Sequence, residues 1–130
     1  MTMPGMLIAI SAGATLGAML RWWLGRLFNH FFPAIPPGTL IANLVAGYIV
    51  GLAISYLASH PGLSPQWRLF IITGFCGSLS TFSTFSAELA SLLQQERFGL
   101  LAASATLHVG GSLFMTLLGI ATVSALRGSS

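Results

Sequence analysis

Residues 73–88 read TGFCGSLSTFSTFSAE, an apolar segment interrupted by glycines, hydroxyl side chains and two phenylalanines three positions apart. The segment lies in the middle of a chain that otherwise has the composition of membrane-spanning helices. Backbone that leaves the helical conformation at membrane depth is tolerated only where protein covers it or where it lines an aqueous path. The interruption therefore indicates that something polar crosses the membrane at this point.

The low charge content excludes a soluble fold of this size. Of the 130 residues, 55% are hydrophobic and 5% are charged, whereas a soluble domain carries about 25% charged residues. The net charge of +3 is spread along the chain without a basic patch, so nucleic-acid binding is not expected. Cys76 is the single cysteine and cannot form an internal disulfide. The start, MTMPGMLIAI, lacks a basic region and a clear cleavage site, so we expect it to begin the first span.

Four windows are long and apolar enough to cross a bilayer, which needs about 20 mainly apolar helical residues. They cover about residues 5–26, 38–58, 67–93 and 98–125, and the segments between them are rich in proline, polar or charged residues. We predict an all-α membrane protein with four transmembrane helices and a break in the third. The whole chain, residues 1–130, would form a single transmembrane domain.

The arginines give almost no preference for one orientation in the membrane. Four spans put both termini and the middle loop on one side, which carries Arg68 and Arg127. The other side carries Arg26 and Arg97, and also Arg21 if its side chain extends that way. Positive loops favour the cytoplasm, so this near balance is what a protein inserting both ways would show. A single topology set by weak cues and an antiparallel homodimer of oppositely inserted copies both remain open from charge alone.

Asn43 lies on one face of the second span with Thr39, Gly47 and Gly51. Small residues at this spacing let helices approach closely in lipid. A carboxamide at membrane depth is costly unless it has a partner, and its two N–H groups suit an interhelical hydrogen bond or an anion. Both interpretations of Asn43 remain open from the residue alone.

The fourth span carries Ser104, His108, Ser112 and Thr116, four positions apart. They form one polar face over about 18 Å of helix. Each hydroxyl is able to bond to the carbonyl one turn back, but four residues in register favour a face turned toward water or an ion. For His108, a packed polar bridge is the alternative.

Within the third span, residues 74–80 (GFCGSLS) combine two glycines with two serines, which favours unwinding. Unwound carbonyls at membrane depth bind cations in discontinuous transporter helices. If an antiparallel partner crosses at the same point, the carbonyls of both copies would converge on the two-fold axis. A monovalent cation such as Na⁺ would neutralise them there, as a structural site off the transport path.

Phe82 and Phe85 share one face of the half-helix that follows. An aromatic ring has a positive edge, so a ring turned edge-on stabilises a small anion without holding it as tightly as a full charge. Ordinary packing is the alternative for this pair.

Glu88 lies one turn beyond Phe85, and an intramembrane carboxylate is a functional candidate by default. It would serve as a proton carrier, a cation site or the end of a polar track.

Four segments of the sequence resemble the Fluc fluoride channels, also called CrcB proteins. They are GATLGAMLRWWLG (13–25), PPGTLIANLVAGYIVG (36–51), TGFCGSLSTFSTFSAE (73–88) and GSLFMTLLG (111–119). They follow the order and spacing of the family and cover all four spans. The resemblance implies a fluoride-selective passive channel, not an enzyme, built as an antiparallel dual-topology homodimer with two pores. It also implies a prokaryotic cell membrane, where the channel lets cytoplasmic F⁻ leave and so gives fluoride resistance.

The resemblance further implies roles for individual residues. Asn43 would donate to fluoride, and Phe82 and Phe85 would meet it with their ring edges. The backbone carbonyls of Gly77 and Ser80 would bind a central structural Na⁺. The other pathway positions, with Arg21 in the vestibule, would be Thr39, Thr84, Ser86, Glu88, His108, Ser112 and Thr116.

Two residues depart from the family pattern. Ser104 occupies a position where an aromatic hydroxyl is common, so the outer end of the polar track differs. Ser78 replaces a frequent glycine beside the cation site, which is tolerated if only carbonyls bind. The donors that remain suit fluoride, because several weak donors replace its hydration water without a deep energy well.

The main alternative is a small multidrug-type exporter, also four-span and dual-topology, with Glu88 as the carboxylate of proton-coupled cation exchange. Those exporters carry that carboxylate in the first span, where this sequence has none. A membrane assembly subunit without transport is a third possibility. Catalysis is not expected, because the sequence has no Asp, no GxSxG turn and no cluster with metal-ligand spacing.

Overall fold

The computed structural model describes residues 2–128, and the regular structure of this part of the chain is helical. The α-helices are α1 (Met3–Phe28), α2 (Pro37–Ala58), α3 (Pro65–Arg68), α4 (Gly77–Leu79), α5 (Phe82–Gln94), α6 (Phe98–Ala105) and α7 (Gly111–Gly128). A 3₁₀ turn, Asn29–Phe31, follows α1. Two π-helical segments, Leu69–Cys76 and Thr106–Gly110, join α3 to α4 and α6 to α7.

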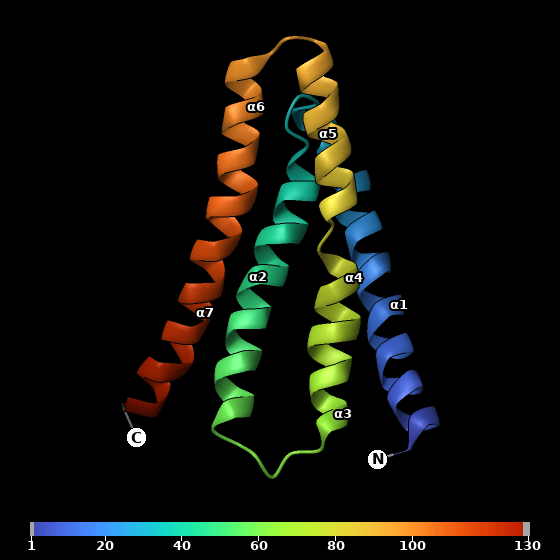
Figure 1. Ribbon diagram of the computed structural model, residues 1–130, viewed down its shortest axis with the longest axis vertical. Helices are drawn as coiled ribbons and strands as arrows, with labels where there is room; N and C mark the ends of the chain where they lie inside the picture. The colour runs from blue at the N-terminus through green and yellow to red at the C-terminus, as the bar shows by residue number, and fades with distance from the viewer. Residues whose placement is uncertain (1, 129–130) are drawn as a thin grey trace.

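Four helical spans are long and apolar enough to cross a bilayer, namely Met3–Phe31, Pro37–Ala58, Pro65–Gln94 and Phe98–Gly128. Each predicted window lies inside one of them, so the prediction of an all-α chain with four membrane-spanning helices is confirmed. Both termini and the α2–α3 loop lie at one end of the molecule, and the other two connections lie at the opposite end (Figure 1).

The spans pair in two sets. α2 packs along α7, while α1 packs along Leu69–Cys76 and α4. Figure 1 accordingly shows α7 and α1 on opposite sides of the molecule, with α2 and the third span between them. The small buried core lies where α2 meets the third span and consists of Ala42, Ala46, Cys76 and Leu79.

Glycines set how closely the paired helices approach. A Cβ on Gly17 of α1 would meet the carbonyl oxygen of Phe75, and a Cβ on Gly51 of α2 would meet the carbonyl oxygen of Thr116. At both crossings backbone therefore contacts backbone. Lipid tails are as apolar as the helix surfaces, so this close van der Waals packing holds the spans together rather than burial from water.

The third span breaks at Ser80 and Thr81, whose extended ψ angles are 153° and 111°. The prediction that residues 74–80 unwind is wrong over most of that range, because the chain stays helical as far as Leu79. Glycine at membrane depth keeps its helical hydrogen bonds, since no water is present to replace them. The backbone leaves the helix only where the side chain of Asn43 accepts the freed N–H.

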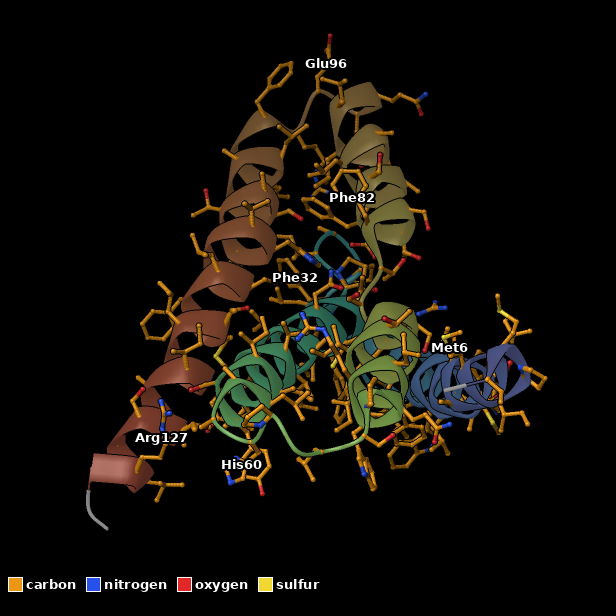
Figure 2. All side chains as sticks on the ribbon, turned by 60° about the horizontal axis from the view of Figure 1, so that its bottom comes forward. Met6, Phe32, His60, Phe82, Glu96 and Arg127 are labelled. Atoms are coloured by element: carbon orange, nitrogen blue, oxygen red, sulfur yellow. The ribbon has the colours of Figure 1, made fainter. Side chains whose placement is uncertain are left out.

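Beyond the break, α5 and α6 form a hairpin that departs from the rest of the bundle. α5 packs chiefly on α6. Figure 2 shows the hairpin apart from α1, with Glu96 at its tip. Glu96 takes a φ of 57° to make the turn. Because of the break, α5 runs in a different direction from Pro65–Leu79, the part of the third span that precedes it.

Gly51→Ala tests the close approach of α2 and α7. The added methyl group has to displace the backbone of α7, and overpacking of this kind costs about 1–3 kcal/mol. We expect a lower thermal unfolding midpoint in detergent, followed by tryptophan fluorescence. The control is Gly99→Ala in α6, where a Cβ meets nothing within 4 Å. Equal midpoints for the two variants would contradict the packing described here.

Candidate functional site

Asn43 of α2 bridges the break in the third span. Its side-chain Oδ1 accepts the amide N–H of Thr81 at 2.7 Å, and its Nδ2 lies 3.4 Å from the Thr81 carbonyl oxygen. In a continuous α-helix the N–H of Thr81 would donate to the carbonyl of Gly77. Asn43 takes over that acceptor role, so the Gly77 carbonyl loses its helical donor. The carboxamide lets the backbone bend without leaving an amide unpaired in lipid.

Side chains also satisfy the two helix ends that meet at the break. The Thr81 hydroxyl accepts the N–H of Thr84 at 3.2 Å and so caps the start of α5. On the other side, Nε of Arg21 donates to the carbonyl oxygen of Ser78 at 3.0 Å. Sequence analysis placed Arg21 in a vestibule, and the structure gives it this additional contact with the end of α4. Residues of α1 and α2 therefore hold the break in the third span.

A cavity of about 210 Å³ lies beside the break. Its lining combines an amide, an imidazole, hydroxyls and aromatic rings, without lysine or arginine: Asn43, Ser80, Thr81, Phe82, Phe85, His108, Val109 and Ser112. Five of the predicted pathway residues, drawn from three different spans, line it. The structure thus brings the second-span amide, the third-span aromatic pair and part of the fourth-span polar face to one place.

The two phenylalanines meet edge to face, with ring centroids 5.8 Å apart and planes at 73°. Phe85 is buried and stacks on the imidazole of His108, with centroids 4.5 Å apart. Phe82 lines the cavity but is 77% exposed, and Figure 2 shows it near the start of α5. The wall that Phe82 forms is therefore incomplete within one copy of the chain.

His108 lies between Asn43 and Glu88. Its Nδ1 is 2.9 Å from Nδ2 of Asn43, and its Nε2 is 4.0 Å from Oε1 of Glu88. The imidazole belongs to the π-helical segment Thr106–Gly110, and such segments concentrate at functional sites. Within residues 2–128, Nε2 of His108 and Oε1 of Glu88 are buried without a hydrogen-bond partner. Such atoms are rare in folded proteins, and a water molecule that both donates and accepts would satisfy the two.

Two further cavities flank this arrangement. One, of about 380 Å³, is lined by Arg21, Arg26, Asn29, Thr39 and Thr84, among others. The other, of about 220 Å³, is lined by Glu88, Ser91, Gln95 and Arg97 with neighbouring residues. The predicted vestibule residue Arg21 therefore shares a cavity with the predicted pathway residues Thr39 and Thr84.

Sequence analysis missed Asn29 as a lining residue of the larger flanking cavity. Its Oδ1 accepts the backbone N–H of Thr39 at 3.1 Å. The residue directly precedes a loop rich in phenylalanine and proline, where an asparagine is usual, so no sequence pattern distinguished it.

Two residues of the predicted path, and Ser104 of the predicted fourth-span polar face, lie outside these cavities. Thr116 packs at the α2–α7 crossing, with Oγ1 3.0 Å from the Gly47 carbonyl oxygen and 3.1 Å from that of Ser112. Ser86 is exposed on α5. Ser104 is buried, and its hydroxyl has no hydrogen-bond partner in the described part of the chain. These positions would contact an ion only after rearrangement or assembly.

Asn43→Leu tests the bridge across the break. The substitution leaves the N–H of Thr81 and Nδ1 of His108 without partners, and each unsatisfied buried group costs about 1–3 kcal/mol. We expect a clear fall in the thermal unfolding midpoint in detergent. Ser83→Ala, which removes an exposed hydroxyl from the same end of α5, should change stability by less than about 0.5 kcal/mol. A midpoint for Asn43→Leu equal to that of Ser83→Ala would show that the bridge is dispensable.

Comparisons with known proteins agree on one family. The family model described as "CrcB-like protein, Camphor Resistance (CrcB)" matches residues 8–120. A relative from Nitrosomonas europaea, named fluoride-specific ion channel FluC, is 58% identical over 123 residues, which cover 95% of this chain and 97% of the relative. A relative with the same name from Pseudomonas paraeruginosa is 58% identical, over 94% of this chain and 96% of its own length. Another, from Pseudomonas syringae pv. maculicola, is 60% identical, over 88% of this chain and 90% of its own length.

Proposed function

This chain belongs to the CrcB-like protein family, and we propose that it is a fluoride-selective passive ion channel. Its relatives carry the name of ion channels, so the prediction that the chain is not an enzyme is confirmed. The observation that carries the fluoride proposal is the donor set of the cavity beside the break. An amide, hydroxyls and aromatic rings converge there from three spans.

The donor set fits a small, strongly hydrated anion. Nδ2 of Asn43 and the hydroxyl of Ser112 supply N–H and O–H groups in place of water. Phe82 and Phe85 supply ring edges, which carry partial positive charge. Many weak donors lower the cost of dehydration without forming a deep well, and conduction needs an ion to leave as readily as it enters. Arg21 and Arg26 in the flanking cavity would attract anions toward this point.

The working unit in this proposal is an antiparallel homodimer with two pores. We infer that a second copy completes the wall, because Phe82 is 77% exposed although it lines the cavity. Irregular backbone such as Ser80–Thr81 also has to be covered by protein at membrane depth. The nearly even arginine distribution supports oppositely inserted copies.

A structural Na⁺ at the dimer axis fits the residues of the break. The carbonyl of Gly77 has lost its helical donor to Asn43, and Gly77 and Ser80 are both exposed on the surface of the single copy. Within residues 2–128 no group of three His, Cys, Asp or Glu side chains gathers to bind a metal, so backbone oxygens are the natural ligands. Hard cations prefer such oxygen ligands. Their charge would hold together two sets of carbonyl dipoles that otherwise repel.

The direction of flow follows from the passive mechanism. In a prokaryotic cell membrane, HF that enters dissociates in the cytoplasm and leaves F⁻ trapped. The inside-negative potential favours outward movement of an anion by about 2.3 kcal/mol per 100 mV. The channel would thereby confer resistance to fluoride without an energy source.

Purified protein in liposomes loaded with potassium fluoride tests the proposed function. We expect fluoride efflux on addition of a potassium ionophore, no dependence on a pH gradient, and no efflux from matched chloride-loaded vesicles. Phe82→Ala should lower the fluoride rate by about tenfold, which corresponds to about 1.4 kcal/mol. Leu113→Ala, at an exposed position of α7 outside the cavity, is the matched control.

The same assay separates the channel from a proton-coupled cation exporter. If Glu88→Gln abolished transport while Phe82→Ala and Phe85→Ala had no effect, the exporter would be the better description. Equal efflux of chloride and fluoride would also refute the proposal.

Gly62→Cys in a Cys76→Ala background tests dual topology. Gly62 lies in the α2–α3 loop, and a Cβ there meets nothing within 4 Å. Oppositely inserted copies place this loop on both sides of the membrane, so an impermeant maleimide should label about half of the protein in sealed cells and the rest after permeabilisation. Labelling of all or none of the protein from outside would indicate a single topology.

A further inference from the structure

We propose that His108 is a positioning residue that holds the Asn43 carboxamide in its conducting orientation, and that protonation of His108 releases Asn43 and closes the path. The proposal rests on the proposed function and adds a regulatory step to it. It follows from the donors and acceptors around three side chains that the structure places in contact.

The orientation of Asn43 is fixed by the backbone. The N–H of Thr81 lies 2.7 Å from the side-chain atom that accepts it. A backbone N–H can only donate, so that atom has to be the carbonyl oxygen of the carboxamide. The other end of the side chain, which lies 2.9 Å from Nδ1 of His108, is therefore the NH₂ group. This assignment follows from the bonding and needs no choice between the two amide orientations.

The tautomer of His108 follows in turn. Since Asn43 presents N–H donors to the imidazole, Nδ1 has to be the acceptor and carries no proton. In the neutral ring the proton then lies on Nε2, which faces Oε1 of Glu88 at 4.0 Å. A carboxylate on that side stabilises an N–H pointing toward it. His108 and Asn43 thus form a directed series of donor and acceptor that ends at the backbone of Thr81, and the Glu88 carboxyl group faces the Nε2 end of the ring without a direct hydrogen bond.

A second proton on His108 would break this series. The protonated ring donates from both nitrogens, so Nδ1–H would face the NH₂ group of Asn43. To avoid two N–H donors facing each other, Asn43 has to turn its side-chain oxygen toward the ring. That oxygen then no longer accepts from Thr81, so the N–H at the break is left unpaired. The amide donor would then point away from its present place in the cavity wall.

The imidazole ring of His108 has little freedom to move away from the NH₂ group of Asn43. His108 is 3% exposed, and Phe85 stacks on it with an interplanar angle of 26°. The charged group that faces it is Glu88 on α5, and Asn43 of α2 is uncharged. α6 carries no titratable side chain. Tyr48 of α2 is bonded to Thr122 of α7 instead, 3.0 Å away, and Arg127 lies at the distant end of α7.

Two substitutions separate positioning from bulk packing. His108→Asn places an amide oxygen where Nδ1 lies and cannot be protonated, whereas His108→Leu removes the acceptor. We expect fluoride efflux by the wild-type protein to fall about tenfold or more as the pH is lowered stepwise from about 7.5 until His108 gains its second proton, which the nitrogen NMR described below detects. His108→Asn should retain most of the flux and change less than about twofold over the same range. His108→Leu should be about tenfold slower throughout this range, as loss of one hydrogen bond predicts.

His60→Asn is the matched control, because His60 is exposed in the α2–α3 loop and stacks on Tyr56. It should keep the wild-type flux and the wild-type pH profile. Rates from protein-free vesicles are subtracted at each pH to remove leakage of HF. A wild-type profile that is flat, or one that His108→Asn shares, would overturn the proposal.

Nitrogen NMR of ¹⁵N-histidine-labelled protein in bilayers provides a readout that does not depend on transport. His30→Gln and His60→Gln together leave His108 as the one labelled imidazole of the three in the chain. At about pH 7.5 we expect an unprotonated Nδ1 and a protonated Nε2. A proton on Nδ1 would refute the positioning role. If the wild-type protein carries no fluoride yet shows the expected tautomer, the channel proposal fails while the contact of His108 with Asn43 stands.

Discussion

The amide N–H of Thr81 needs an acceptor at membrane depth, and the side chain of Asn43 is that acceptor. An unpaired backbone group in hydrocarbon costs several kcal/mol, so a broken helix persists there only if another element supplies the missing bond. Once α2 supplies it, the chain is free to change direction at Ser80 and Thr81. The orientation of α5, and with it the placement of Phe82 and Phe85, depends on this interaction, which the contacts of Arg21 and the Thr81 hydroxyl support at the two helix ends.

In the proposed function, the same side chain would serve both stability and transport. Asn43 uses its oxygen to hold the break and presents its NH₂ group to the cavity, where an imidazole now accepts it. The Gly77 carbonyl loses its helical donor, and it is the oxygen that we propose binds the cation. In this proposal, one amide side chain would account for an anion donor on one side of the break and a free acceptor on the other. Substitutions at this position cannot alter one role without the other.

Much of the fold follows from hydropathy alone, because four apolar windows have few alternatives in a bilayer. The position of the break did not follow as closely. Glycine and serine content pointed to residues 74–80, but the decisive acceptor belongs to Asn43, which is 38 positions distant in the chain. Local composition cannot reveal a tertiary hydrogen bond. Likewise, the spacing of Ser112 and Thr116 predicted one polar face, whereas Thr116 bonds to the backbone at a helix crossing.

The pairing of α2 with α7 has a consequence for how the protein is made. Proteins emerge from the ribosome with the N-terminal part first, so α1 can meet its partner in the third span while synthesis continues. The face of α2 that carries Gly51 has to wait until residues 111–128 have been translated, because it packs on the backbone of α7. The pairing of α2 with α7 therefore forms after the pairing of α1 with the third span.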